Sequence, residues 1–433
     1  MTSAPALASD IHRLSATELA RGLHSRSLSA EAVARACLAR VAERDGELQA
    51  WVHVDESQVL AQARALDQGP VRGLLHGLPV GVKDVFDTHD MPTQYGSPIY
   101  AGFRPRADAA PVALAREAGA VLLGKTATTE FSTFQASPTR NPRNVKHTPG
   151  GSSSGSCAAV GADMVPLAFG AQTAASIIRP AAYCGVVGYK PTYGLISGVG
   201  VKPLSHTLDT IGCVARTVDD VALFAAALSG DKTLADLPAI HQPLRIGLCK
   251  PHADQLLPET HTAMELAAKQ LAAAGAKVVE IALSPDHTQL TQAHIDIMAF
   301  ETARALSDER LRHGDEISAG LRGVIDKGLQ MDYAHYAAQL RYVEETRATL
   351  PALYARCDVL LAPSAAGEAP LFESGTGDPA WCRMWTLLGL PCVHLPFTQG
   401  PQGLPVGLQA VGALHSDRTT LAASAWMLKQ LTA

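Results

Sequence analysis

The chain has 433 residues, a formal net charge of −5, and a composition in which 47% of the residues are hydrophobic and 18% are charged. This length can bury a large core, and the composition is that of a folded globular protein. The negative charge and the lack of a long basic stretch exclude an electrostatic attraction to nucleic acid. The sequence has no run of eighteen apolar residues, so it predicts no membrane-spanning helix.

The N-terminal segment and the cysteines favour a cytoplasmic location. The first twenty residues include Asp10, Arg13 and Glu18 and lack an apolar stretch, so no secretory signal is predicted. Eight cysteines are scattered through the chain without a Cys-x-x-Cys pair. This pattern favours buried thiols in a reducing compartment over disulfides.

Helices are predicted for the N-terminal part of the chain, over residues 15–66. Within it, Ser29 can cap a helix that has Val33, Cys37 and Val41 among its apolar positions. From Leu74 onward, short apolar runs alternate with glycine and proline turns. Buried strands are predicted there at 80–86, 120–123 and 164–169, with a helix at 111–118 leading into the second strand.

The C-terminal half predicts further alternation of strands and helices. A strand–helix–strand unit is expected over 244–249, 259–274 and 278–283. Residues 288–350 are mostly helical in pattern, and the remaining elements are strands at 359–362 and 393–396 and a helix at 417–431. No repeat or low-complexity linker divides the chain. We therefore expect one α/β domain over residues 1–433, with a large, mixed, mostly parallel sheet covered by helices on both faces.

Three polar residues in glycine-rich segments predict nucleophilic catalysis. Lys83 lies in Gly-Leu-Pro-Val-Gly-Val-Lys-Asp, Ser152 lies in Pro-Gly-Gly-Ser-Ser-Ser-Gly-Ser, and Ser176 follows 24 residues later in Gly-Ala-Gln-Thr-Ala-Ala-Ser-Ile-Ile-Arg-Pro-Ala. A serine hydroxyl needs a neighbouring base to attack at neutral pH. A lysine can be that base if burial lowers its pKa towards neutrality, and the apolar residues around Lys83 provide such a setting.

These segments resemble the amidase signature family of serine hydrolases. The resemblance is densest from about Leu74 to Ala215, which would be the signature core, and it extends from near Leu14 to the last helix. The order Ser-Ile-Ile-Arg-Pro is similar to the malonamidase-type branch, because most relatives place the arginine two residues after the nucleophile. The resemblance implies a single amidase domain with an N-terminal helical segment at about 15–66 and a variable, mostly helical segment at about 284–350.

The resemblance also implies a role for each polar residue. Lys83 would be the base. Ser152, at which a cis peptide is implied, would relay the proton, and Ser176 would attack the carbonyl carbon. Backbone amides of the preceding turn would form the oxyanion hole, which assigns it to Thr173, Ala174, Ala175 and Ser176. No cofactor is implied. Residues 284–345 and 377–381 are expected to border the mouth of the site.

The chain departs from the family pattern in two places. Ala174 and Ala175 stand where relatives usually have glycines, and their methyl groups would narrow the pocket. Gln172 stands where most relatives have an aspartate that can pair with the arginine. Gln172 and Arg179 are therefore candidates for binding substrate, with Arg179 holding a substrate carboxylate. The alternative for Arg179 is a structural role, in which it bonds loop carbonyls or an acid such as Asp209.

Two other motifs match formally but lack their structural context. Residues 119–126 fit the phosphate-loop pattern, yet the predicted strand lies between the two glycines instead of before them. Residues 151–155 fit the Gly-x-Ser-x-Gly nucleophile elbow around Ser153, yet a strand does not precede them. A nucleotide-binding protein and an elbow-type hydrolase are therefore disfavoured.

We expect an amidohydrolase that cleaves the C–N bond of a linear amide through an acyl-enzyme. The same residues could serve a carbamate or ester hydrolase, and a non-catalytic amidotransferase-like subunit is the less expected alternative. The expected partner is a small-molecule amide or carbamate, with no nucleic acid and no membrane, and a homodimer is the assembly considered. The histidine spacing matches no metal-binding motif, so no metal is expected.

Overall fold

The computed structural model describes residues 10–283 and 287–432. Residues 1–9, which belong to the segment expected to lack a secretory signal, lie outside the described residues. Residues 284–286, where the expected variable segment begins, also lie outside them. Among the described helices, none is both long and apolar enough to cross a membrane.

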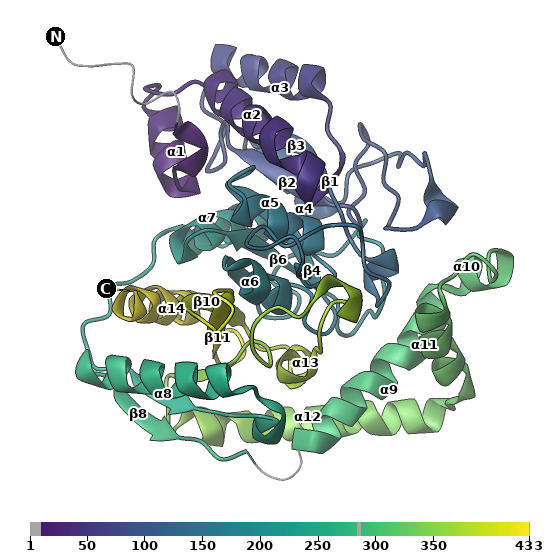
Figure 1. The fold of residues 1–433 in the computed structure, drawn as a ribbon, viewed down its shortest axis with the longest axis vertical. Helices are drawn as coiled ribbons and strands as arrows, with labels where there is room; N and C mark the ends of the chain where they lie inside the picture. Colours follow the sequence, from purple (N-terminus) through teal and green to yellow (C-terminus); the bar gives the residue numbers. More distant parts are fainter. Residues whose placement is uncertain (1–9, 284–286, 433) are drawn as a thin grey trace.

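Eleven strands form one sheet that runs through the molecule (Figure 1). They are β1 (Trp51–His53), β2 (Pro79–Lys83), β3 (Val121–Thr126), β4 (Leu167–Gln172), β5 (Val187–Lys190), β6 (Thr210–Ala215), β7 (Arg245–Leu248), β8 (Lys277–Glu280), β9 (Val359–Pro363), β10 (Cys392–Gln399) and β11 (Pro405–Val411). Their order across the sheet is β1-β3-β2-β4-β6-β5-β10-β11-β9-β7-β8.

The sheet is mixed, as expected, but the prediction that it is mostly parallel is wrong. Four pairs of neighbours in the described sheet are parallel: β2–β3, β2–β4, β7–β8 and β7–β9. The other six pairs are antiparallel. Parallel neighbours need a long crossover, whereas antiparallel neighbours can be joined by a short turn such as the one between β10 and β11.

The helices surround this sheet. They are α1 (Ala16–His24), α2 (Ala30–Leu48), α3 (Glu56–Gln68), α4 (Ala110–Glu117), α5 (Ser154–Gly161), α6 (Ile178–Cys184), α7 (Val218–Ser229), α8 (Pro258–Ala273), α9 (His287–Ala305), α10 (Ser307–Arg312), α11 (Ala319–Gln330), α12 (Tyr333–Tyr354), α13 (Ala380–Leu387) and α14 (Asp417–Leu431). The expected final helix matches α14, and the expected strand–helix–strand unit is β7–α8–β8 with its two strands parallel.

The local signals explain most element boundaries. Ser29 caps α2, and its side chain accepts a hydrogen bond from the amide of Ala32. The strand expected at 80–86 ends earlier, at Lys83, where a turn begins. The strand expected at 164–169 is shifted to β4, because Pro166 has no amide to donate to a sheet.

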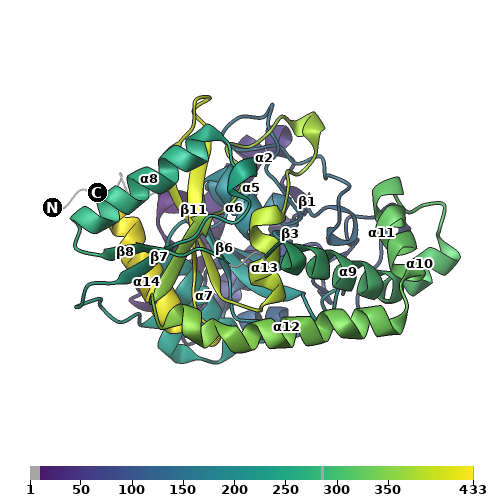
Figure 2. The same cartoon turned by 90° about the horizontal axis from the view of Figure 1, so that it is seen from below.

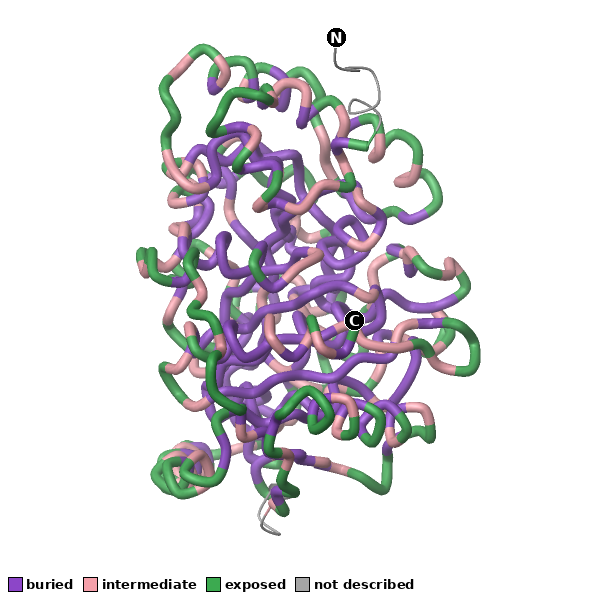
Figure 3. The backbone as a smooth tube through the Cα atoms, turned by 90° about the vertical axis from the view of Figure 1, so that its left-hand side faces the viewer, coloured by how far each residue is buried: buried purple, intermediate pink, exposed green. Residues whose placement is uncertain are grey.

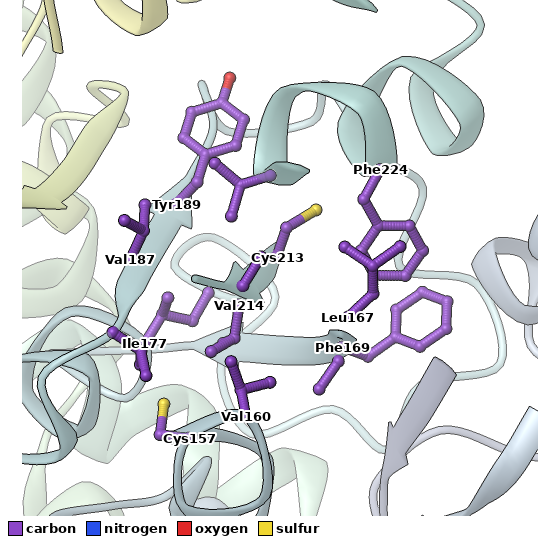
Figure 4. Packing of buried hydrophobic residues seen from close by; sticks show 14 of the residues in the cluster. Cys157, Val160, Leu167, Phe169, Ile177, Val187, Tyr189, Cys213, Val214 and Phe224 are labelled. Atoms are coloured by element: carbon purple, nitrogen blue, oxygen red, sulfur yellow. The ribbon is translucent and has the colours of Figure 1, made fainter. Parts of the chain in front are cut away.

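Helices cover both faces of the middle strands. Phe169 of β4 points towards Phe224 of α7 on one face, and Cys157 and Val160 of α5 lie on the opposite face (Figure 4). Buried residues fill the middle of the molecule, and the exposed ones lie on the outer helices and turns (Figure 3). The sheet is therefore packed on both faces, which fixes the ends of its strands in place.

The helices α9 to α12 extend away from the sheet (Figure 2). α9 and α12 run side by side, and α11 packs on α9 near the far end of this arm. α13 also packs against α9. This arrangement places the helical segment against the loops at one edge of the sheet.

Candidate active site

Lys83 and the loop that carries Ser176 leave the sheet at the same edge. β2 and β4 are parallel neighbours, with Gly81 opposite Ala168. β2 ends at Lys83, and β4 ends at Gln172, four residues before Ser176. In α/β sheets the carboxyl ends of parallel strands commonly carry the functional site.

Ser152 lies in the turn that leads into α5. Its Oγ lies 2.7 Å from Lys83 Nζ, and Nζ also donates a hydrogen bond to the carbonyl oxygen of Ala171 at 3.2 Å. The peptide bond between Gly151 and Ser152 is cis, as the resemblance implies. The amide of the next residue, Ser153, donates to the carbonyl oxygen of Ser176 at 3.2 Å, so the two serine segments are in direct contact.

Burial sets the protonation of Lys83. Its side chain is fully buried, and desolvation lowers its pKa to about 7. The charge of Asp209 acts in the opposite direction, because a nearby carboxylate favours the protonated amine. A lysine with this pKa is present in both protonation states at neutral pH, which an exposed lysine is not.

In the loop over residues 173–176 the carbonyl groups are bonded, whereas the amides are free. The carbonyl oxygens of residues 173, 174 and 175 accept hydrogen bonds from His294 Nε2 (2.8 Å), Thr386 Oγ1 (2.8 Å) and the amide of Arg179 (2.9 Å). Among the described residues, no acceptor contacts the amides of residues 173–176. Free amides in a loop beside a nucleophile are suited to stabilising an oxyanion.

His294 has a single protonation state in this network. Its Nδ1 accepts a hydrogen bond from Arg383 Nη1 at 2.9 Å, because a guanidinium can only donate. The proton is therefore on Nε2, which donates to Thr173. Burial and the charge of Arg383 lower the pKa of His294 to about 3, so the ring is neutral.

Gln172 uses its whole side-chain amide within the protein. Its Oε1 accepts from the amides of Ile177 (2.9 Å) and Ile178 (3.0 Å), and its Nε2 donates to Thr386 Oγ1 at 2.9 Å. These contacts hold both sides of the loop around Ser176. An aspartate at this position could accept from the amides but could not donate to Thr386.

Arg179 bonds backbone carbonyls, the structural role considered from the sequence. Its Nη1 donates to Gly377 at 2.5 Å, and its Nη2 donates to Gly151 at 2.7 Å and to Thr376 Oγ1 at 3.2 Å. Asp209, the acid considered as a partner for Arg179, instead accepts from Thr173 Oγ1 at 2.6 Å. Arg179 thus ties the turn before Ser152 to the segment before α13.

A pocket lies beside Ser176. Both segments expected at the mouth of the site contribute to it. The lining residues are Ser132, Thr133, Phe134, Thr173, Ala174, Ser176, Arg179, Leu204, Met298, Thr302, Val324, Pro379 and Arg383. Sequence patterns did not single out Arg383 or His294. The available signal was Arg383 as the one charge within the apolar helix Ala-Trp-Cys-Arg-Met-Trp-Thr-Leu.

The segments of the two competing motifs are structural. Residues 121–126 form the buried strand β3, and Lys125 Nζ donates to Phe86 and Thr93 and pairs with Asp84 at 3.5 Å. The strand position argues against a phosphate-binding loop, as predicted. Ser153 is buried, and its Oγ lies 3.4 Å from the amide of Ala171.

One acidic cluster lies outside the pocket. His89, Asp90 and Asp108 place their ligand atoms within 4.8 Å of one another. Both carboxylates bond Arg116, at 2.6 Å and 2.9 Å. Arg116 already pairs with both carboxylates, so these contacts describe an ion-pair cluster.

Comparisons with known proteins show similarity over most of the chain. The family described as Amidase matches residues 32–421. A glutamyl-tRNA(Gln) amidotransferase subunit from Acidothermus cellulolyticus is 34% identical, over 94% of this chain and 92% of its own length.

Two solved structures are similar over nearly the whole fold. One is a chain of an inhibitor-bound vestigial protein complex that reveals the evolutionary origins of an s-triazine catabolic enzyme. It is 29% identical with a TM-score of 0.88, and the match covers 96% of this chain and 98% of that chain. The native peptide amidase of Stenotrophomonas maltophilia is 28% identical with a TM-score of 0.82 and covers 97% of each chain.

Proposed function

Because the chain belongs to the amidase family, we propose that it cleaves the carbon–nitrogen bond of an amide through an acyl-enzyme formed on Ser176. The observation that carries this proposal is the 2.7 Å separation of Lys83 Nζ and Ser152 Oγ. It lies in a buried setting where a pKa of about 7 leaves much of the lysine neutral. A neutral lysine can accept a proton, as a general base must.

In the proposed acylation step, neutral Lys83 accepts the hydroxyl proton of Ser152. One of the N–H groups of Lys83 donates to the carbonyl oxygen of Ala171 at the same time. Ser152 takes the proton of Ser176, whose oxygen bonds to the amide carbon. The amides of residues 173–176 stabilise the negative charge that develops on the carbonyl oxygen. The proton then returns through the relay to the leaving nitrogen, and the C–N bond breaks.

Deacylation uses the same groups. Water loses a proton to the relay and attacks the acyl carbon, the bond from this carbon to Ser176 Oγ breaks, and the relay returns the proton to Oγ as the carboxylic acid leaves. The proposed site therefore consists of Lys83, Ser152 and Ser176 with the loop amides. Gln172 and Arg179 hold the surrounding loops in this proposal, and contact with the substrate is left to the other residues of the pocket.

A labelling experiment tests the proposed nucleophile. A fluorophosphonate should attach to Ser176 in a peptide map, and Ser176→Ala should neither be labelled nor release ammonia from an amide panel. Ser153→Ala is the matched control and should still be labelled at Ser176. A label on another serine, or a Ser176→Ala enzyme within tenfold of wild-type activity, would refute the assignment.

A second candidate is a subunit of an amidotransferase, the alternative that sequence patterns made less expected. It now has more support than an isolated hydrolase of linear amides, because the curated relatives compared are glutamyl-tRNA(Gln) amidotransferase subunits. Such a protein would use the same attack on an amide but deliver the released nitrogen to an acceptor held by a partner. Unlike the non-catalytic subunit first considered, it would need the complete relay.

The amide donor distinguishes the two candidates. The purified chain should be assayed for ammonia release from glutamine and asparagine beside simple amides, carbamates and esters. A preference of more than tenfold for glutamine or asparagine would favour the amidotransferase. A preference for other amides would favour the hydrolase, and a preference for carbamates or esters would redefine its substrate.

We also propose a cytoplasmic location, supported by the eight buried free thiols.

A further inference from the structure

The pocket beside Ser176 has an unusual balance of charge. Its walls include the apolar side chains of Phe134, Leu204, Met298 and Val324. Two arginines, Arg179 and Arg383, also line it, and no acidic residue is among its described lining residues. The pocket is therefore apolar along its sides and positive where the guanidinium groups lie.

The two arginines differ in how the protein uses them. Both terminal nitrogens of Arg179 are bonded to backbone carbonyls. Arg383 makes one hydrogen bond, from Nη1 to Nδ1 of His294. No carboxylate among the described residues forms a salt bridge with Arg383, although only 8% of the residue is exposed.

Arg383 keeps its charge in this position. Burial lowers its pKa to about 10, which still leaves it protonated at neutral pH. The charge of Asp378 acts on Arg383, but the two residues form no salt bridge. A buried cation that lacks a direct ion pair is unfavourable in a folded protein, and a ligand carboxylate that pairs with it reduces this penalty. Its Nε and Nη2 atoms have no described acceptor, and Arg383 borders the same pocket as Ser176.

We propose that Arg383 binds a carboxylate of the substrate, so that the site acts on short amides that carry an acid group at the end away from the scissile bond. This inference rests on the proposed function, because it assumes attack by Ser176 in the same pocket. The guanidinium can bond a carboxylate through two parallel N–H groups. His294 holds the third nitrogen and so fixes the direction of the fork.

The charge balance also narrows the class of acid. A substrate with an α-ammonium group, such as glutamine, would bring a second charge that needs an acidic partner. None of the described lining residues is acidic, and Asp378, whose charge acts on both arginines, is not among them. We therefore expect an ω-amide of a simple dicarboxylic acid to be preferred over the amino acid of the same length, a result that would favour the hydrolase over the amidotransferase candidate.

The kinetic test compares each acid with a neutral molecule of the same shape. The pairs are succinamate with 4-oxopentanamide and glutaramate with 5-oxohexanamide, in which a methyl ketone replaces the carboxylate. Wild type should prefer the acids by about 30-fold or more in kcat/KM, since losing a charge-paired contact changes affinity by at least this factor. It should also prefer glutaramate to glutamine by about tenfold.

Substitution at Arg383 tests the assignment. In Arg383→Met the ratio of acid to neutral substrate should fall to within about threefold of one, and Arg383→Lys should keep an intermediate ratio. Arg322→Met, which removes an exposed arginine of α11, is the matched control and should keep the wild-type ratio. A wild type that prefers the neutral amides, an Arg383→Met enzyme with the wild-type ratio, or a preference for glutamine would overturn the inference.

Binding separates this inference from the proposed chemistry. Succinamate should bind to the inactive Ser176→Ala protein in calorimetry and bind at least about tenfold more weakly when Arg383→Met is added. Equal binding by both proteins, or no binding by either, would overturn the carboxylate site. Hydrolysis of succinamate by Ser176→Ala would instead refute the proposed nucleophile. The role of Arg383 would then be judged from the calorimetric affinities alone.

Discussion

The Nε2 atom of His294 lies 2.8 Å from the carbonyl oxygen of Thr173, although the two residues are 121 positions apart in the chain. α9 thus holds the loop that precedes the proposed nucleophile. Because the imidazole is neutral and its other nitrogen is bonded to Arg383, the donor cannot turn away from Thr173 without breaking a second hydrogen bond. The helical arm therefore takes part in shaping the oxyanion loop.

Replacing His294 by alanine should slow acylation of Ser176 by about ten- to a hundredfold, because a small shift of a positioning group changes catalytic rates by such factors. His294→Gln can return a donor to Thr173 and should recover part of the rate. The measurement is the rate of fluorophosphonate labelling at several pH values. Equal rates for the alanine variant and wild type would exclude a positioning role. Equal losses of rate in both variants would show that the hydrogen bond donated to Thr173 does not set the rate.

The pH dependence should report Lys83. Below its pKa of about 7 the amine is protonated and cannot accept a proton, so kcat/KM should fall about tenfold per pH unit on the acid side and level off above it. Lys83→Met should lose several orders of magnitude in rate, and Lys83→Arg should not restore it, because a guanidinium stays protonated. A flat profile between pH 5.5 and 9 would argue against a lysine base.

The two neighbouring serines should respond differently to alanine. Ser152→Ala removes the hydroxyl that contacts Lys83, so acylation should slow by about 10²- to 10⁴-fold. Ser153→Ala removes two long contacts of 3.4 Å, to the amide and to the carbonyl oxygen of Ala171, and should stay within about tenfold of wild type. Single-turnover measurements on both variants test this order. The reverse order would mean that Ser153 is the relay.

The sequence predicted that the motifs lie on buried strands, although it misplaced the ends of these strands by about three residues. Lys83 could be placed at a buried strand because apolar residues surround it. α5 could not be predicted from Ser-Gly-Ser-Cys-Ala-Ala-Val-Gly, because glycine and serine disfavour helices and only burial against the sheet stabilises it. The short strand β1 was missed because three residues give no periodic pattern.

The pocket lining was harder to predict for a physical reason. His294 and Thr386 reach the loop 173–176 from helices more than 100 residues away in sequence, and Arg383 bonds His294. A polar residue in a helix does not reveal which loop it will contact, because that depends on tertiary packing. Arg179 was noticed because it lies beside the proposed nucleophile, yet its bond to Gly377 depends on a segment nearly 200 residues further along.

Arg179→Ala should therefore act on the fold of the site and not on the choice of substrate. It leaves the carbonyl groups of Gly151 and Gly377 without their donor, and each buried group that loses its partner costs about 1–3 kcal/mol. The free energy of unfolding, measured with urea, should drop by about 2 kcal/mol or more. kcat/KM should fall in the same proportion for succinamate and for its neutral counterpart, in contrast to Arg383→Met. A selective loss of activity on the acid substrate, with the free energy of unfolding unchanged, would indicate that Arg179 binds the substrate carboxylate.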